Sequence, residues 1–207
     1  MFFRILQLIV VQLKVVYYFC RKYEGMTFDD ITADGRLWAV RYDGETDNAL
    51  FQLFDRWNDV SWLREFLKTN ISDLSSYFRI TDVNKAIYDT IDDAEILQCL
   101  IMDISSDADL DRIFRPLENF RTSDELLGKE KARLKSEICR PSWLRIYAIK
   151  LSVGVYVVTG GAIKLTASMQ EREHTLHELH KLEAVRRYLL DAGIVDNEGF
   201  IEYLSES

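Results

Sequence analysis

Hydrophobic positions follow a strand-like period in one part of the chain and a helical period in the next. Residues 37–42, Leu-Trp-Ala-Val-Arg-Tyr, lie between two Asp-Gly pairs and are typical of a strand. After Asn48, apolar and aromatic residues recur at helical spacing as far as Leu67. We therefore expect Asn48 to cap a helix whose apolar stripe faces the core, with a kink or a break between Trp57 and Trp62.

A second helical pattern runs from Ile80 to Ile104, and its expected cap is Asp82 or Asn84. Three aspartates then alternate, at positions 107, 109 and 111. A calcium loop has such an alternation but needs a glycine at its sixth position, where Arg112 stands. We interpret this stretch as the solvated start of a helix.

Residues 122–125, Thr-Ser-Asp-Glu, are typical of a helix N-terminus. The predicted helix continues through Leu126 and Leu127 into a basic run of Lys129, Lys131, Arg133 and Lys135. This run is either a solvated helix face or a helix that faces phosphates, because basic residues serve both roles.

The next segment predicts a hairpin, with strands at 143–151 and 155–159 and a turn at 152–154. Gly160 and Gly161 interrupt the return strand, which we expect to resume at 162–166 after a bulge. A last helix carries apolar residues from Met169 to Leu189 and ends at Gly193, and residues 199–204 pack back onto the domain. Together these elements predict an α+β fold with a small antiparallel sheet packed with helices.

Composition favours one folded, reduced domain. The chain has 207 residues, 48% of them hydrophobic and 29% charged, which suits a single domain over residues 26–207 and argues against disorder. Cys20, Cys99 and Cys139 lie far apart and form no C-x-x-C pair. Reduced thiols in the cytoplasm explain them better than a disulfide framework or a cysteine zinc site.

The net charge of −8 is unevenly distributed. Residues 26–125 carry 10 basic and 22 acidic side chains, whereas residues 126–187 carry 12 basic and 6 acidic ones. The last twenty residues contain five acids and no base. The mean charge argues against an unspecific nucleic-acid binder, but the basic segment restores this possibility for one part of the chain.

The first 25 residues form an apolar segment that Arg4, Gln7, Gln12 and Lys14 interrupt. They lack the small-residue cleavage site of a secretory signal, and a central lysine disfavours a spanning helix. Three interpretations stay open: a strand or helix of the domain, a membrane anchor, or sequence upstream of a true start at Met26. No stable membrane association is expected.

Several well-known catalytic motifs are missing. The sequence has no P-loop, no G-x-G-x-x-G, no G-x-S-x-G and no H-E-x-x-H, which disfavours an ATPase, a dinucleotide enzyme or a serine hydrolase. Gly160-Gly161 followed by Lys164 resembles a phosphate cradle only loosely. His174, His177 and His180 are spaced three apart, so they suit a solvated helix face, an acid/base role for one of them, or a metal that takes two.

The basic hairpin is the sharpest candidate for chemistry. Arg145 and Tyr147 share one face of their strand, while Lys150 lies on the other. Lys164 and Arg172 flank the connection to the last helix. Cations beside an acid/base group are what phosphodiester cleavage requires, and aromatic rings stack on splayed bases. A Tyr/Arg-rich sheet edge without activity is the alternative.

The element order and the sequence of the C-terminal half resemble those of the RelE/HigB-like toxins of type II toxin–antitoxin systems. The resemblance covers residues 37–70 and 115–190. It rests on Arg115-Pro116-Leu117, the basic segment 127–135, the strand Leu144-Arg145-Ile146-Tyr147, the return strand that leads to Lys164, and Thr175–Leu179. Residues 71–114 would be an inserted helical layer. The chain also resembles uncharacterised proteins of gut Bacteroidota, which imply no function.

The resemblance implies a RelE-like core that cleaves mRNA by acid/base chemistry without a metal or other cofactor. By position, Arg145 and Lys164 match the family's basic residues, and Tyr147 and His174 are acid/base or stacking groups. The implied RNA-binding residues are Lys129, Lys131, Arg133, Lys135, Lys150 and Arg172. The implied partners are RNA, in some members on the ribosome, and a small helix-turn-helix antitoxin.

Two departures from the family leave a different function open. Family toxins are usually basic and about half as long, whereas this chain is acidic. The same scaffold without nuclease activity would be an interaction protein, with its acidic helical layer holding a basic or DNA-binding partner. A metal-dependent enzyme is the third interpretation.

Overall fold

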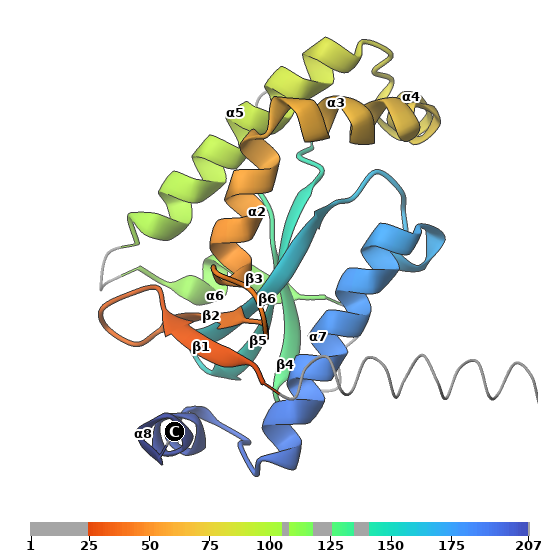
Figure 1. Cartoon of the computed structure of the whole chain (residues 1–207). Helices are drawn as coiled ribbons and strands as arrows, with labels where there is room; N and C mark the ends of the chain where they lie inside the picture. The colour runs from red at the N-terminus through yellow and green to blue at the C-terminus, as the bar shows by residue number, and fades with distance from the viewer. Residues whose placement is uncertain (1–24, 105–107, 118–125, 135–140, 207) are drawn as a thin grey trace, which may run out of the picture.

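A six-stranded sheet forms the centre of the protein, and helices cover both of its faces (Figure 1). The structure, a computed structural model, describes residues 25–104, 108–117, 126–134 and 141–206. The strand order is β1-β2-β6-β5-β4-β3. The strands are β1 (Thr27–Asp30), β2 (Leu37–Arg41), β3 (Phe114–Pro116), β4 (Gly128–Ala132), β5 (Leu144–Ser152) and β6 (Val155–Ile163). The predicted α+β class is confirmed; the sheet is antiparallel except between β2 and β6, which are parallel.

The helices form two groups with separate cores. The helices are α2 (Ala49–Asn58), α3 (Val60–Thr69), α4 (Ile71–Phe78), α5 (Val83–Met102), α6 (Leu110–Ile113), α7 (Glu173–Asp191) and α8 (Asn197–Glu206), and a 3-10 turn, η1, spans Met169–Glu171. Residues of α2 to α5 pack on the sheet face that carries Ile146 and Ala148. Residues of α7 and α8 pack on the opposite face, which carries Tyr147 and Ile149. Alternate residues of β5 thus serve different cores.

The capping residues act as the sequence predicts. The Asn48 side chain accepts hydrogen bonds from the backbone N–H groups of Leu50 and Phe51 and begins α2. Asp59 lies in the predicted break, where it ends α2 and caps α3. Asp82 caps α5 through the N–H of Asn84. Each cap satisfies donors that the first helical turn leaves without an internal acceptor.

The predicted basic helix at 122–135 is wrong where the structure describes it, because residues 128–132 form strand β4. Gly128, Glu130 and Ala132 are buried, and the two lysines between them are half-buried. This period of two is the pattern of a strand with one face on a core. Residues 118–125 and 135–140, which include the expected helix start and Lys135, lie outside the described residues.

The hairpin of β5 and β6 is confirmed, although its third predicted strand continues β6 as far as Ile163. The bulge lies where Tyr147 pairs with Gly160 but Ala148 pairs with Val158. Gly160 has a φ of +155°, and a Cβ there would lie 2.2 Å from the Glu178 Oε2. A Cβ on Gly161 would lie 2.4 Å from the Arg145 carbonyl oxygen. Strand and helix packing therefore accounts for the glycine pair, and no phosphate is needed to explain it.

The C-terminal elements agree with the prediction in part. Met169 belongs to η1 rather than to the last long helix, and Gly193 follows the end of α7 with a φ of +79°. Phe200 of α8 packs back onto the sheet against Phe28 and Trp38, as expected. Residues 1–24 lie outside the described residues. Among the residues placed by the structure, no helix is both long and apolar enough to span a membrane.

Candidate functional site: a cationic groove at the end of the sheet

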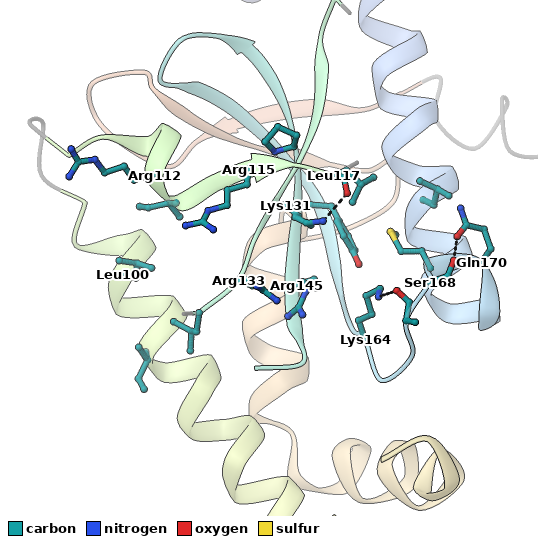
Figure 2. Close-up of a pocket in the computed structure, with 18 residues that line it drawn as sticks. Leu100, Arg112, Arg115, Leu117, Lys131, Arg133, Arg145, Lys164, Ser168 and Gln170 are labelled. Atoms are coloured by element: carbon teal, nitrogen blue, oxygen red, sulfur yellow. Dashed lines mark hydrogen bonds between the residues drawn. The ribbon is translucent and has the colours of Figure 1, made fainter. Parts of the chain in front are cut away.

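A groove of about 1190 Å³ lies at the end of the sheet where β4 finishes and β5 begins. In Figure 2, Leu100 of α5 lies on one side of the groove, and Ser168 and Gln170 lie on the other. Lys131, Arg133 and Arg145 lie between these two walls (Figure 2).

Strand register brings the cations of the groove together. Arg115 of β3 pairs with Lys131 of β4, and Lys131 pairs with Tyr147 of β5, so their side chains form one row across three strands. Ala132 pairs with Ile146, which places Arg133 beside Arg145 in the next row. Three short segments that are far apart in sequence therefore supply one continuous surface.

The lining of the groove, as far as the structure describes it, carries six cations and no carboxylate. These residues are Arg112, Arg115, Lys131, Arg133, Arg145 and Lys164. Only Arg112 forms an ion pair with a described residue, Asp109, at 3.2 Å, and that pair is solvent-exposed. In a chain with a net charge of −8, a cationic concavity whose described lining holds no acid favours an anionic ligand.

Neutral carbonyl groups hold the inner cations in place. Lys131 Nζ donates to the Leu117 carbonyl oxygen at 2.7 Å, and Lys164 Nζ donates to those of Thr166 and Ala167 at 2.7 and 2.5 Å. One terminal nitrogen of Arg145 donates to the Ser142 and Leu144 carbonyls at 2.7 and 2.6 Å. These bonds fix the side chains without neutralising their charges.

Burial and mutual repulsion lower the pKa values of these cations. Burial, followed by the charge of Arg133, lowers the pKa of Arg145 to about 10, so the guanidinium stays charged at neutral pH. Burial and the charges of Arg145 and Arg133 lower the pKa of Lys131. Burial and the charges of Arg145 and Lys131 lower the pKa of Lys164. The groove therefore holds two lysines that release a proton more readily than a solvated lysine.

Tyr147 supplies an unsatisfied hydroxyl to the same groove. Its side chain is 1% exposed and lines the groove, and its hydroxyl has no hydrogen-bond partner among the residues that the structure describes. Burial raises its pKa, the charge of Arg145 opposes this only in part, and the charge of Glu178 raises the pKa further. The hydroxyl therefore stays protonated. A buried donor without an acceptor costs free energy that an anionic ligand would recover.

The structure brings five of the ten predicted site residues into the groove: Lys131, Arg133, Arg145, Tyr147 and Lys164. Lys135 lies outside the described residues. The other four, described next, line no part of the groove.

Each of those four has a different position and partner. Lys129 pairs with Glu183 of α7, and Arg172 pairs with Asp73 of α4. Lys150 lies on the opposite face of the sheet, bound to Asp111. His174 bonds through its Nε2 to the Ile163 carbonyl oxygen at 3.0 Å, and its ring packs edge-on against that of Phe66.

No metal site emerges from the described histidines or aspartates. The part of the chain described by the structure contains no group of three or more histidine, cysteine, aspartate or glutamate residues that could hold a metal ion. Asp109 caps α6, as expected for a helix start, and Asp111 accepts hydrogen bonds from Lys150 and Tyr156. Asp107 lies outside the described residues.

Sequence reasoning missed Arg112 and Arg115 as members of the site. Both precede or lie in β3, a strand of three residues that is too short to show a period. Pro116 is a local signal for this strand, because proline is tolerated at the edge of a sheet. Pairing with β4 brings Arg115 to Lys131, and no pattern local to Arg115 reveals that contact.

Comparisons with known protein-family models, curated proteins and solved structures give no match to this chain.

Proposed function

We propose that the protein binds RNA in the cationic groove and cleaves it as a metal-independent endoribonuclease. The observation that carries the proposal is that Lys131, Arg145 and Lys164 line one groove with Tyr147, and that the described lining contains no carboxylate. The hydroxyl of Tyr147 has no hydrogen-bond partner among the described residues. A polyanion suits the charge of the groove. The cleavage chemistry follows from the kinds of side chain that surround the bound phosphate.

The groove holds a group for each demand of RNA cleavage. In this reaction the 2′ oxygen loses its proton and bonds to phosphorus, while the 5′ oxygen leaves and takes up a proton. Lys131 and Lys164 have lowered pKa values, so one of them accepts the proton of the 2′ hydroxyl and the other donates a proton to the leaving 5′ oxygen. Arg145 and Arg133 stabilise the extra negative charge on the phosphorus oxygens. Tyr147, kept protonated, donates a hydrogen bond to the reacting phosphate.

The resemblance to RelE/HigB-like toxins supports the same proposal. Three strands that carry the resemblance, β2, β5 and β6, belong to one sheet, and the helix that follows β2, α2, packs on it. The chain would then be a cytoplasmic toxin with a small helix-turn-helix antitoxin as its partner, and the ribosome would be a place of cleavage. The position of His174 outside the groove removes it from the proposed mechanism.

Tyr147→Phe is the decisive test because it removes one oxygen that bonds to no described residue and keeps the aromatic ring in place. The full chain is incubated with a single-stranded RNA in excess EDTA, and cleavage and binding are measured separately. We expect wild type to produce 2′,3′-cyclic phosphate ends, and the variant to bind RNA equally but cleave about 100-fold more slowly. Tyr88→Phe is the matched control, because Tyr88 is 70% exposed on α5 and lines no part of the groove.

The chemistry has its own control on the RNA. An RNA with 2′-O-methyl groups keeps the phosphates and bases but lacks the nucleophile, so it should bind and stay intact. Cleavage that needs added metal, or cleavage that Tyr147→Phe leaves unchanged, contradicts the proposed mechanism. RNA that neither binds nor is cut contradicts the proposal as a whole.

The second candidate function is a non-enzymatic interaction protein that holds a basic or DNA-binding partner. The observation that favours it is the acidic outer surface at α5, where Asp92, Glu95 and Asp103 are exposed. A basic partner would bind there with an affinity that falls as salt rises. Replacing the three acids by amides should abolish that association, whereas association that depends neither on salt nor on these acids excludes this function.

A further inference from the structure

The two walls of the groove differ in chemistry. The strands and the residues next to them supply five of the six cations, whereas α5 supplies the aliphatic side chains of Ile96 and Leu100. These two residues are one helical turn apart, so they lie side by side on one face of α5. They are 56% and 42% exposed, and in Figure 2 Leu100 lies on the far side of the groove from Lys164.

The core does not account for these two side chains. The face of α5 that packs on the sheet is made by other residues, among them Ala94, Leu97 and Ile101, which are fully buried. Ile96 and Leu100 lie outside that stripe and face the groove instead. An exposed apolar pair in the wall of a charged groove indicates a ligand that has both charged and apolar parts.

Charge along α5 determines which part of such a ligand each wall takes. Asp92 lies one turn before Ile96, and Asp103 lies three residues after Leu100, so an acid stands at each end of the apolar pair. These acids repel phosphate groups from α5, while Arg115 and Arg133 attract them to the strands. The backbone of a bound nucleic acid therefore lies on the strands, and its neutral bases turn toward α5.

We infer that α5 is the base-binding wall of the groove, and that the substrate is RNA with unpaired bases. The inference rests on the proposed function and specifies its substrate class. A duplex keeps its bases stacked inside, so it presents only phosphates and sugars to this wall. Unpaired bases are free to lie on Ile96 and Leu100, which bury apolar surface on both sides of the contact.

A matched pair of variants tests the wall. Leu100→Ser and Met102→Ser remove equal chemistry from one helix, because both side chains are 42% exposed but only Leu100 lines the groove. Ile96→Ser is combined with Leu100→Ser for the larger effect. We expect the Ile96→Ser/Leu100→Ser variant to bind a single-stranded RNA decamer about tenfold more weakly than wild type, and Met102→Ser to bind it equally.

The RNA supplies the second half of a double-mutant cycle. A decamer with abasic sites keeps its phosphates and loses the groups that would contact α5, so wild type and the wall variant should bind it with the same affinity. A duplex of the same sequence should also fail to distinguish the two proteins. The loss should therefore appear only where both the wall and the bases are present.

The outcomes separate this inference from the proposed function. If single-stranded RNA binds through Lys131 and Lys164 but the wall variant binds it as well as wild type does, the base-binding wall is wrong and the RNA-binding groove stands. If the wall variant loses as much affinity for duplex and abasic RNA as for single-stranded RNA, α5 acts on the shape of the groove. This result also overturns the inference. If no RNA binds wild type, the proposed function fails first.

Discussion

Two polar clusters lie on opposite faces of the same sheet, and they treat their cations differently. On the face toward α2 to α6, Lys150 and Tyr156 both donate to the carboxylate of Asp111. On the face toward α7, Lys131 donates to a backbone carbonyl, and the hydroxyl of Tyr147 has no partner among the described residues. The first cluster pairs its cation with a carboxylate, whereas no described carboxylate lines the groove that holds the second.

This difference separates structural cations from those available to a ligand. Several described cations outside the groove are paired with acids, as Arg172 is with Asp73 and Lys181 is with Glu178. A paired cation stabilises the fold at little cost to its surroundings. The groove cations repel one another and are partly desolvated, so the fold tolerates them rather than gains from them. Such an unfavourable cluster of charges makes the groove a candidate functional site.

The largest expected effect is on RNA affinity. The double variant Lys131→Met/Lys164→Met removes two charges that contact no described carboxylate, and we expect affinity for single-stranded RNA to fall about 100-fold at about 0.1 M salt. RNA binding releases fewer counterions when it makes fewer phosphate contacts. The slope of log K against log salt should therefore become shallower by about 1.4. Lys85→Met is the matched control, since Lys85 is exposed on α5 and pairs with Asp89. An unchanged salt slope in the double variant would mean that RNA binds elsewhere.

The next effect is on stability, in the paired cluster. Asp111→Asn removes the charge that Lys150 and Tyr156 share, and we expect the free energy of unfolding to fall by about 1–2 kcal/mol at pH 7. Burial by itself raises the pKa of Asp111, but the hydrogen bonds from Lys150 and Tyr156 outweigh it, so the net pKa is lowered. The stabilisation is therefore full above the ordinary aspartate pKa, and it disappears as pH falls through the lowered one.

Chemical denaturation of both proteins between pH 2 and pH 7 measures this difference. The two stabilities should converge at the acid end. A cost that persists unchanged at pH 2 would show that the substituted amide disturbs packing rather than removing a charge.

The two tyrosines give a smaller effect of opposite sign on the two faces. Tyr156→Phe deprives Asp111 of a donor and should destabilise the fold by about 1 kcal/mol. Tyr147→Phe deletes a buried hydroxyl that has no hydrogen-bond partner among the described residues, so it should stabilise the fold by about 1 kcal/mol. Urea unfolding of the two variants beside wild type checks both signs. Destabilisation by Tyr147→Phe would reveal a structural partner for its hydroxyl.

The sequence predicts the elements better than it predicts the site, because elements follow local patterns. The caps at Asn48 and Asp82 and the hairpin of β5 and β6 depend on neighbours within a few residues, and all are confirmed. The basic run at 129–133 was misassigned to a helix because residues before it look like a helix start. Its alternation of lysines with Glu130 and Ala132 already had the period of a strand.

The site depends on register and on pairing, which lie beyond local patterns. The period of two placed Arg145 and Tyr147 on one face and Lys150 on the other, and the structure agrees. It did not show that Arg115 comes to Lys131, because that contact joins two short strands. Nor did it show that Asp73 of α4 pairs with Arg172, 99 residues later, which removes a predicted RNA-binding cation. Only the fold decides which cations find an acid.

The smallest effect tests whether the groove lysines are a burden on the fold. Lys131→Met removes a half-buried charge that lies among Arg133 and Arg145, so we expect the free energy of unfolding to rise by about 0.5 kcal/mol at pH 7, after allowance for solvent screening. Burial and these neighbours lower the pKa of Lys131 in the folded state. Between that lowered pKa and the ordinary lysine value, the unfolded chain binds more protons than the folded one. Wild type therefore gains stability as pH rises through this window, and its deficit against the variant should shrink. Thermal unfolding from pH 7 to pH 10 measures the deficit; a deficit that grows with pH, or a variant less stable than wild type at pH 7, would show that Lys131 supports the fold as Lys150 does.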